Sequence, residues 1–200
     1  MHFSQAWKLA ALLPALAIGG CLSLGAEPPD KLLNLTAEAF APAGSEQSGT
    51  RAEALAIHEP HVPAEVDVLR VPVRVSDTEL AYLQDAVWVE KPARLFRRLV
   101  AETVRVRTGR FVIDGDDPGL GAESHLRGVL REFGYDAATS SVVVRYDAIK
   151  QRDGGAVEAK RFEAIESGVI AKPGPVGAAL NRTSNEVARQ VADWLSEGEA

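Results

Sequence analysis

Three runs of alternating apolar and polar residues, at 123–135, 141–151 and 156–167, constrain the fold more than any other feature of the sequence. Successive side chains of a strand point to opposite faces of a sheet, so each run predicts a strand with one buried face. The segment "DAATS" separates the first two runs, and "RDGG" separates the last two. Because Asp-Gly is a strong hairpin signal, the three runs predict an antiparallel meander.

Shorter patterns predict further strands and two helices. Strands are expected at 31–39, 54–58, 67–75, 78–90 and 110–114. Pro92 suits the first turn of a helix, and apolar residues follow it at helical spacing as far as Gly109, a typical stop. Pro175 opens a last helix. This order predicts an α+β fold with one domain, in which two helices pack on one face of a curved antiparallel sheet.

Composition and charge exclude several classes of protein. The chain has 200 residues, of which 46% are hydrophobic, and this proportion is typical of a globular protein and not of a disordered one. It carries 22 Lys and Arg against 28 Asp and Glu, a net charge of −6. A nucleic-acid-binding domain normally has a basic excess, so we expect no nucleic-acid partner.

Residues 1–20 have the pattern of an export signal. Lys8 provides a positive start, and an apolar run of about ten residues follows it as far as Ile18. That run is half the length needed to span a bilayer, which favours a cleaved signal peptide over a transmembrane helix. Cleavage after Gly20 removes one lysine and no acid, which leaves a net charge of −7.

The signal ends in "IGGC" (18–21), which resembles the lipobox read by bacterial prolipoprotein-processing enzymes. A thiolate is nucleophilic enough to accept a diacylglyceryl group, so Cys21 is the predicted lipidation site and new N-terminus. The alternative is a plain signal peptide followed by an incidental cysteine. A lone thiol is unusual in an oxidising compartment, whereas an acylated one is inert. We expect no cofactor beyond the covalent N-acyl diacylglyceryl lipid on Cys21, with palmitate among its chains.

Residues 21–30 form a predicted lipidated tether that leads into a domain at 31–200. The tether spans at most about 36 Å when fully extended, and Pro28-Pro29 stiffens it. Leu22 stands where an aspartate would resemble the inner-membrane retention signal. The expected location is therefore the periplasmic face of the outer membrane.

The sequence provides no convincing catalytic or metal-binding pattern. His58 and His61 are two candidate metal ligands, but Pro60 prevents the helical register that would make them converge, so we interpret them as loop residues. The acidic run 114–121 lacks the order of an EF-hand loop and is interpreted as a turn. We therefore predict no catalytic residue, no metal site and no enzyme activity.

The first predicted helix carries five arginines, which are Arg94, Arg97, Arg98, Arg105 and Arg107. Such a row can contact phospholipid headgroups or an acidic partner. The alternative is a solvated face balanced by Glu90 and Glu102. The few aromatic residues have the spacing of core residues and do not suggest a lipid groove.

The chain resembles the auxiliary lipoproteins of bacterial ABC-type transport systems, which accompany MCE-type lipid transporters, including those of the paraquat-inducible type. The resemblance rests on the lipobox followed by a short strand, on residues 68–104, and on the helix ending in "VADWL" (191–195). Residues 68–104 contain a W-x-E-x-P-like turn at Trp88, Glu90 and Pro92 before the Leu-rich helix. Two departures are Val87 before Trp88, where the family has Arg, and the acidic loop after Arg110.

The resemblance implies a non-catalytic lipoprotein that docks a transenvelope lipid conduit at the outer membrane. Its partners would be an MCE-domain protein and the ABC permease and ATPase of the same system. Assembly into a homo-oligomer is left open, and no ligand-binding residue is identified. The alternative function is that of a lipoprotein cofactor for outer-membrane assembly or cell-wall synthesis.

Overall fold

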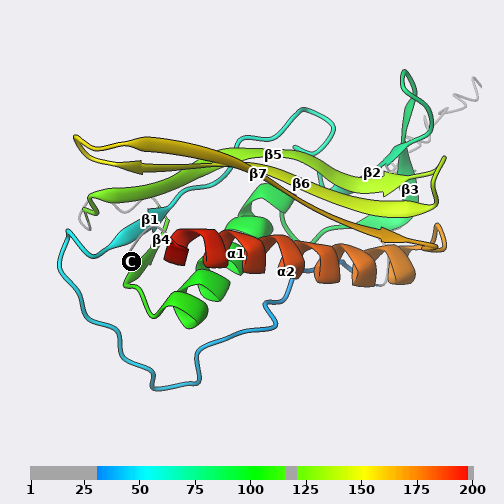
Figure 1. The fold of residues 1–200 in the computed structure, drawn as a ribbon. Coiled ribbons are helices and arrows are strands. Elements are labelled where there is room, and N and C mark those ends of the chain that lie inside the picture. Colours follow the sequence, from blue (N-terminus) through cyan, green and yellow to red (C-terminus); the bar gives the residue numbers. More distant parts are fainter. Residues whose placement is uncertain (1–30, 116–120, 198–200) are drawn as a thin grey trace, which may run out of the picture.

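Within residues 31–115 and 121–197, which the computed structural model describes, seven strands form one layer and two helices form the other (Figure 1). The elements are β1 (Leu55–Ile57), β2 (Arg70–Arg74), β3 (Leu80–Val87), α1 (Pro92–Thr108), β4 (Val112–Asp114), β5 (Ser124–Asp136), β6 (Ser141–Arg152), β7 (Val157–Ser167) and α2 (Pro173–Glu197). The α+β prediction with two helices on one face of a curved sheet is confirmed. The predicted signal 1–20 and tether 21–30 lie outside the described residues.

The predicted meander is the centre of the sheet. Strand β6 pairs antiparallel with β5 on one side and with β7 on the other. The pairing of β5 with β6 shifts register between Leu130 and Glu132, which marks a β-bulge at Arg131. The strands and turns that alternation and Asp-Gly predict are therefore present.

The sheet is mixed, so the expectation of a purely antiparallel sheet is wrong. The second edge of β5 pairs in parallel with β1 near its start and with β2 near its end. Strand β1 also pairs in parallel with β4, and the intervening chain includes α1. Parallel pairing needs a crossover connection of this kind, and strands of three residues are too short for sequence to reveal it.

Residues 31–39 do not form the predicted strand, apart from a single bridge between Leu33 and Trp88. The side chains of two asparagines in α2 make the hydrogen bonds that a neighbouring strand would otherwise make to this segment. The backbone N–H of Thr36 donates to Asn181 Oδ1 (2.8 Å), and that of Glu38 donates to Asn185 Oδ1 (2.8 Å). The Asn185 amide also donates to the carbonyl of Thr36 (2.9 Å), so the segment is fixed to the helix.

Both helices begin at proline, as predicted. Pro92 occupies the first turn of α1, and Gly109 ends the helix in a left-handed conformation with φ 69°, which glycine adopts without strain. Helix α2 begins at Pro173, two residues before the expected Pro175. No helix in the described part of the chain has the length and apolar character needed to cross a bilayer.

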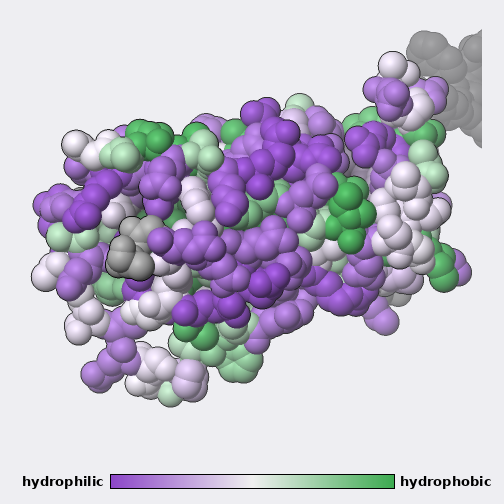
Figure 2. Space-filling view, in the orientation of Figure 1, coloured by the Kyte–Doolittle hydropathy of each residue, from purple (hydrophilic) through white to green (hydrophobic). Residues whose placement is uncertain are grey.

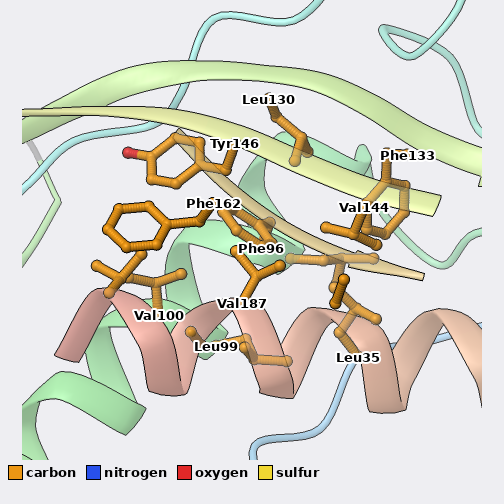
Figure 3. Close-up of a cluster of buried hydrophobic side chains, with 14 of the residues drawn as sticks. Leu35, Phe96, Leu99, Val100, Leu130, Phe133, Val144, Tyr146, Phe162 and Val187 are labelled. Atoms are coloured by element: carbon orange, nitrogen blue, oxygen red, sulfur yellow. The ribbon is translucent and has the colours of Figure 1, made fainter. Parts of the chain in front are cut away.

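The core lies between the helices and the inner face of the sheet (Figure 3). Phe96 of α1 packs against Tyr146 of β6 with ring centroids 5.2 Å apart, and Phe162 of β7 packs against Trp194 of α2 at 5.6 Å. Burial raises the pKa of Tyr146. These aromatic side chains fill the core as the sequence predicts.

Candidate functional site

The predicted lipidation site, Cys21, lies outside the described residues, so its acylation stays a prediction. The described chain begins ten residues later, at Lys31, which is exposed. The part of the acidic run at 116–120 also lies outside the described residues. Among the described residues there is no group of three or more potential metal ligands.

The five arginines of α1 are paired with carboxylates of this chain. The pairs are Arg94 with Glu59 and Glu90, Arg97 with Asp114, Arg98 with Glu90, Arg105 with Glu102, and Arg107 with Asp193. Glu90 and Glu102 balance this face as the second interpretation predicts, and three further acids contribute. The positive charges are thus compensated within the chain. Arg94, Arg98 and Arg107 are exposed, as the second interpretation expects, whereas the side chains of Arg97 and Arg105 are only 16% and 25% exposed.

The ring of His58 lies against the ring of His125. Its Nε2 atom lies 3.1 Å from Nδ1 of His125 on β5, and the two rings are 5.3 Å apart. Nε2 of His125 in turn lies 3.6 Å from a carboxylate oxygen of Asp153. His61 instead joins β5 through its backbone, because its N–H donates to the carbonyl of Gly128 (2.9 Å). The loop interpretation of both residues agrees with this arrangement.

A groove of about 450 Å³ lies between the β2–β3 hairpin and the outer face of the sheet, which is the face turned away from the helices. Its hairpin side is formed by Pro72, Arg74 and residues 76–80. Its sheet side is formed by residues 131–136 of β5 and Val143 of β6, and Glu65 and Val66 complete the lining. Leu80 on the hairpin is 51% exposed, and Ile165, which pairs with Val143, is 54% exposed. The groove therefore has exposed aliphatic side chains near both walls.

The β-bulge in β5 sets the chemistry of this groove. Leu130 and Phe133 both point into the core, although three positions separate them, and both are at most 1% exposed. The extra residue of the bulge lets Arg131 and Glu132 both reach the outer face. Strict alternation would have placed one of these two charged side chains in the core.

Arg74 and Asp136 form the central ion pair of the groove. Nη2 and Nε of Arg74 both donate to Asp136 Oδ2, at 2.6 and 3.0 Å, and Nη1 lies 3.5 Å from Glu132. The backbone N–H of Thr139 and the Arg74 guanidinium lower the pKa of Asp136 below its ordinary value. This pair fixes the hairpin to β5, since Val73 and Arg74 are also the two residues that pair with β5.

Further ion pairs extend from the groove across β6 to β7. Arg145 joins Glu132 on one side to Glu163 on the other. Asp147 accepts hydrogen bonds from Arg161 and Arg131, and these lower its pKa to about 2. The guanidinium and carboxylate groups lie side by side in register, so this face carries alternating fixed charges.

The lining of the groove has an excess of negative charge. Five carboxylates line it, from Glu65, Asp77, Glu79, Glu132 and Asp136, against the guanidinium groups of Arg74 and Arg131. An anionic phosphate is disfavoured there, whereas a segment with positive and aliphatic side chains is complementary to it. The arrangement is that of a binding surface with an apolar margin and a polar centre.

Sequence reasoning missed this groove. Its residues come from four separate stretches of the chain, and none of them forms a motif. The one local signal is "LREF" (130–133), where two large apolar residues are three positions apart in an otherwise alternating run. This spacing is typical of a β-bulge.

Comparisons with known proteins agree with this fold. A family model described as ABC-type transport auxiliary lipoprotein component matches residues 34–192. A search among curated proteins finds no significant match. The match to the family model extends over well over half of the chain.

Solved structures show the same architecture. A DUF330 protein from Xanthomonas campestris has a TM-score of 0.66 at 17% identity, over 84% of this chain and 95% of that one. An uncharacterised protein has a TM-score of 0.65 at 13% identity, over 83% of this chain and 100% of that one. At these identities the likeness shows the fold alone. With residues 34–192 matched and the two-layer fold shared, this chain belongs to the family of ABC-type transport auxiliary lipoprotein components.

Proposed function

We propose that this protein is a non-catalytic lipoprotein of the outer membrane that docks an MCE-type lipid transport system there. The observation that carries the proposal is the family match over residues 34–192, which names an auxiliary component of ABC-type transport. The acylated thioether of Cys21 would hold the domain on the periplasmic face. The MCE-domain protein, the permease and the ATPase of the same system would be its partners.

The outer-sheet groove supports the docking role. It combines exposed aliphatic side chains at its margin with fixed charges at its centre, so it offers both apolar and polar contacts to a partner. Its excess of carboxylates favours an extended partner segment that carries lysine or arginine beside aliphatic residues. We assign this groove to the MCE-domain partner, and the lipid cargo to the conduit formed by that partner.

Photocrosslinking in cells tests the assignment. A photoreactive amino acid in place of Leu80, on the wall of the groove, should capture the MCE-domain protein. The same residue in place of Phe40, which is 70% exposed and outside the groove lining, is the matched control and should not. Capture of a cell-wall synthase or an assembly factor from position 80 would favour the alternative function. Capture of a second copy of this chain would show a homo-oligomer.

Charge reversal tests the preference for a basic segment. Glu79→Lys should reduce the crosslink from position 80, because it replaces an attractive carboxylate with a positive charge. Glu46→Lys, in an exposed loop outside the lining, makes the same change in net charge and should leave the crosslink intact. Equal yields in the two variants would contradict the electrostatic part of the proposal.

The lipid anchor has its own test. Cys21→Ser should abolish both palmitate labelling and sedimentation with the envelope. Retention of the variant in the membrane fraction would refute anchoring through this sulfur.

A further inference from the structure

Three aliphatic side chains are exposed where the described chain begins. Leu32, Leu69 and Val89 are 51%, 45% and 52% exposed, and we call them the apolar corner. Backbone hydrogen bonds hold their segments together. The N–H of Val89 donates to the carbonyl of Leu33 (2.9 Å), and that of Trp88 donates to the carbonyl of Leu69 (2.8 Å). Three segments that are distant in sequence therefore lie side by side, and each has one exposed aliphatic residue.

Strand geometry places two of these side chains on the same face. Leu33 and Trp88 form a parallel bridge, and both side chains pack toward the core, where Trp88 is only 1% exposed. Adjacent residues of extended chain point to opposite faces. Leu32 and Val89 therefore both point away from the core, on the same face of two neighbouring segments, and the parallel register places them diagonally, with Leu32 beside Val87 and Val89 beside Asn34.

Positive charges border the apolar corner. Lys31 adjoins Leu32, Arg70 adjoins Leu69, and Lys91 follows Val89 by two residues. Lys91 is paired with Asp67 (2.9 Å), and the intervening Glu90 is paired with Arg94 and Arg98. The nearby acids Asp67 and Glu90 are thus compensated within the chain, which leaves Lys31 and Arg70 beside the corner. Aliphatic residues flanked by lysine and arginine are typical of surfaces that rest in a membrane interface.

The position of the corner relative to Cys21 identifies the surface that covers it. Lys31 adjoins Leu32 and follows Cys21 by ten residues, which span at most about 36 Å. A lipid on Cys21 would keep the corner within that distance of the bilayer. We propose that the apolar corner lies on the phospholipid bilayer that holds the anchor, with Leu32 and Val89 inserted below the headgroups. This inference depends on the lipid anchor in the proposed function.

Such a contact would orient the whole domain. Figure 1 shows β2 and β3 at one end of the molecule and the C-terminus at the other. The space-filling view shows that hydrophilic residues cover most of the face above α2 and β7 (Figure 2). That face is unsuited to lipid contact, because its charges would lose their hydration. With the corner on the bilayer, the end that carries β1, β4 and the C-terminus would point toward the periplasm.

Probe fluorescence on the complete lipidated protein tests this inference. The acylated Cys21 has no free thiol, so Leu32→Cys or Val89→Cys introduces a single site for an NBD fluorophore. Val157→Cys is the matched control, because Val157 is 63% exposed on β7, away from the corner. Each labelled protein is reconstituted into vesicles of phosphatidylethanolamine and phosphatidylglycerol, with and without doxyl-labelled lipid, and its flotation is recorded.

The expected result is a shift of NBD emission to shorter wavelength, with quenching by doxyl lipid, at positions 32 and 89 and not at 157. Flotation with unquenched probes at 32 and 89, or equal quenching at all three positions, would overturn this inference alone. Failure of the protein to float would overturn the lipid anchor and this inference with it.

Discussion

Asn185 of α2 fixes residues 36–38, near the start of the described chain, to the helix. Its side chain is almost fully buried, and it accepts from Glu38 N–H and donates to the carbonyl of Thr36, at 2.8 and 2.9 Å. Asn181 makes one such bond, to Thr36 N–H, at an exposed position. The two asparagines therefore allow a comparison within one helix: the residue type is the same, but Asn185 is more buried and makes more hydrogen bonds than Asn181.

Asn185→Ala should lower the free energy of unfolding by about 2–3 kcal/mol. The variant loses the two bonds to Glu38 and Thr36 and a third, which the Asn185 amide donates to the carbonyl of Asn181 (2.8 Å). Each bond contributes about 1 kcal/mol, and water can restore part of the lost pairing of the backbone groups. Asn181→Ala should cost about 0.5–1 kcal/mol, because water can replace its single bond. Total stabilities are about 5–15 kcal/mol, so the first change is large and measurable.

Urea unfolding of the unlipidated chain from Leu22, followed through the buried Trp88 and Trp194, measures both variants. Hydrogen exchange should also show lost protection at Glu38 in the Asn185→Ala variant. Equal stabilities for the two variants, or a change below about 0.5 kcal/mol for Asn185→Ala, would refute the reasoning that side-chain amides replace a strand partner here.

Three further predictions concern the sheet and the helix interface. Gly134→Ala should destabilise the fold and weaken the groove crosslink, because the added Cβ would lie 2.5 Å from the carbonyl oxygen of Pro72; an unchanged thermal midpoint would contradict this close approach. The pKa of Asp147 is lowered from 3.8 to about 2, chiefly by Arg161, so its charge stabilises the fold above pH 3.8 and this contribution is lost as the pH falls toward 2. Asp147→Asn should therefore lose less stability on acidification than the wild type in urea titrations at several pH values, and parallel losses would count against it. Ser184→Ala should leave stability unchanged or raise it by up to about 1 kcal/mol in calorimetry, since the buried Ser184 hydroxyl has no hydrogen-bond partner among the described residues; a clear loss of stability would show a partner that the described part of the chain does not account for.

Elements with a complete local pattern could be predicted from the sequence. The meander follows from alternation over more than ten residues per strand, with Asp-Gly at one turn. Helix α1 follows from Pro92 and Gly109 around a helical apolar repeat. In each case the information lies within a few residues, because side-chain direction depends on local backbone geometry.

Other features could not be predicted, because they depend on distant contacts. The strands that the sequence predicts at 54–58 and 110–114 are present as β1 and β4, but their parallel pairing depends on α1, which returns the chain to the same edge. Residues 31–39 have a strand-like pattern, yet their hydrogen bonds go to side chains of α2. A local sequence pattern does not determine which group will form a hydrogen bond with a given backbone N–H or carbonyl.

The sequence by itself determined the two-layer α+β class, the meander, both helices and the family resemblance, since periodicity and turn residues act over short distances. Only the tertiary structure decided the parallel pairings, the pairing of His58 with His125, the groove beneath the hairpin and the apolar corner. Each of these joins residues from segments far apart in the chain. Their proximity depends on packing free energy summed over the whole core, which no single segment contains.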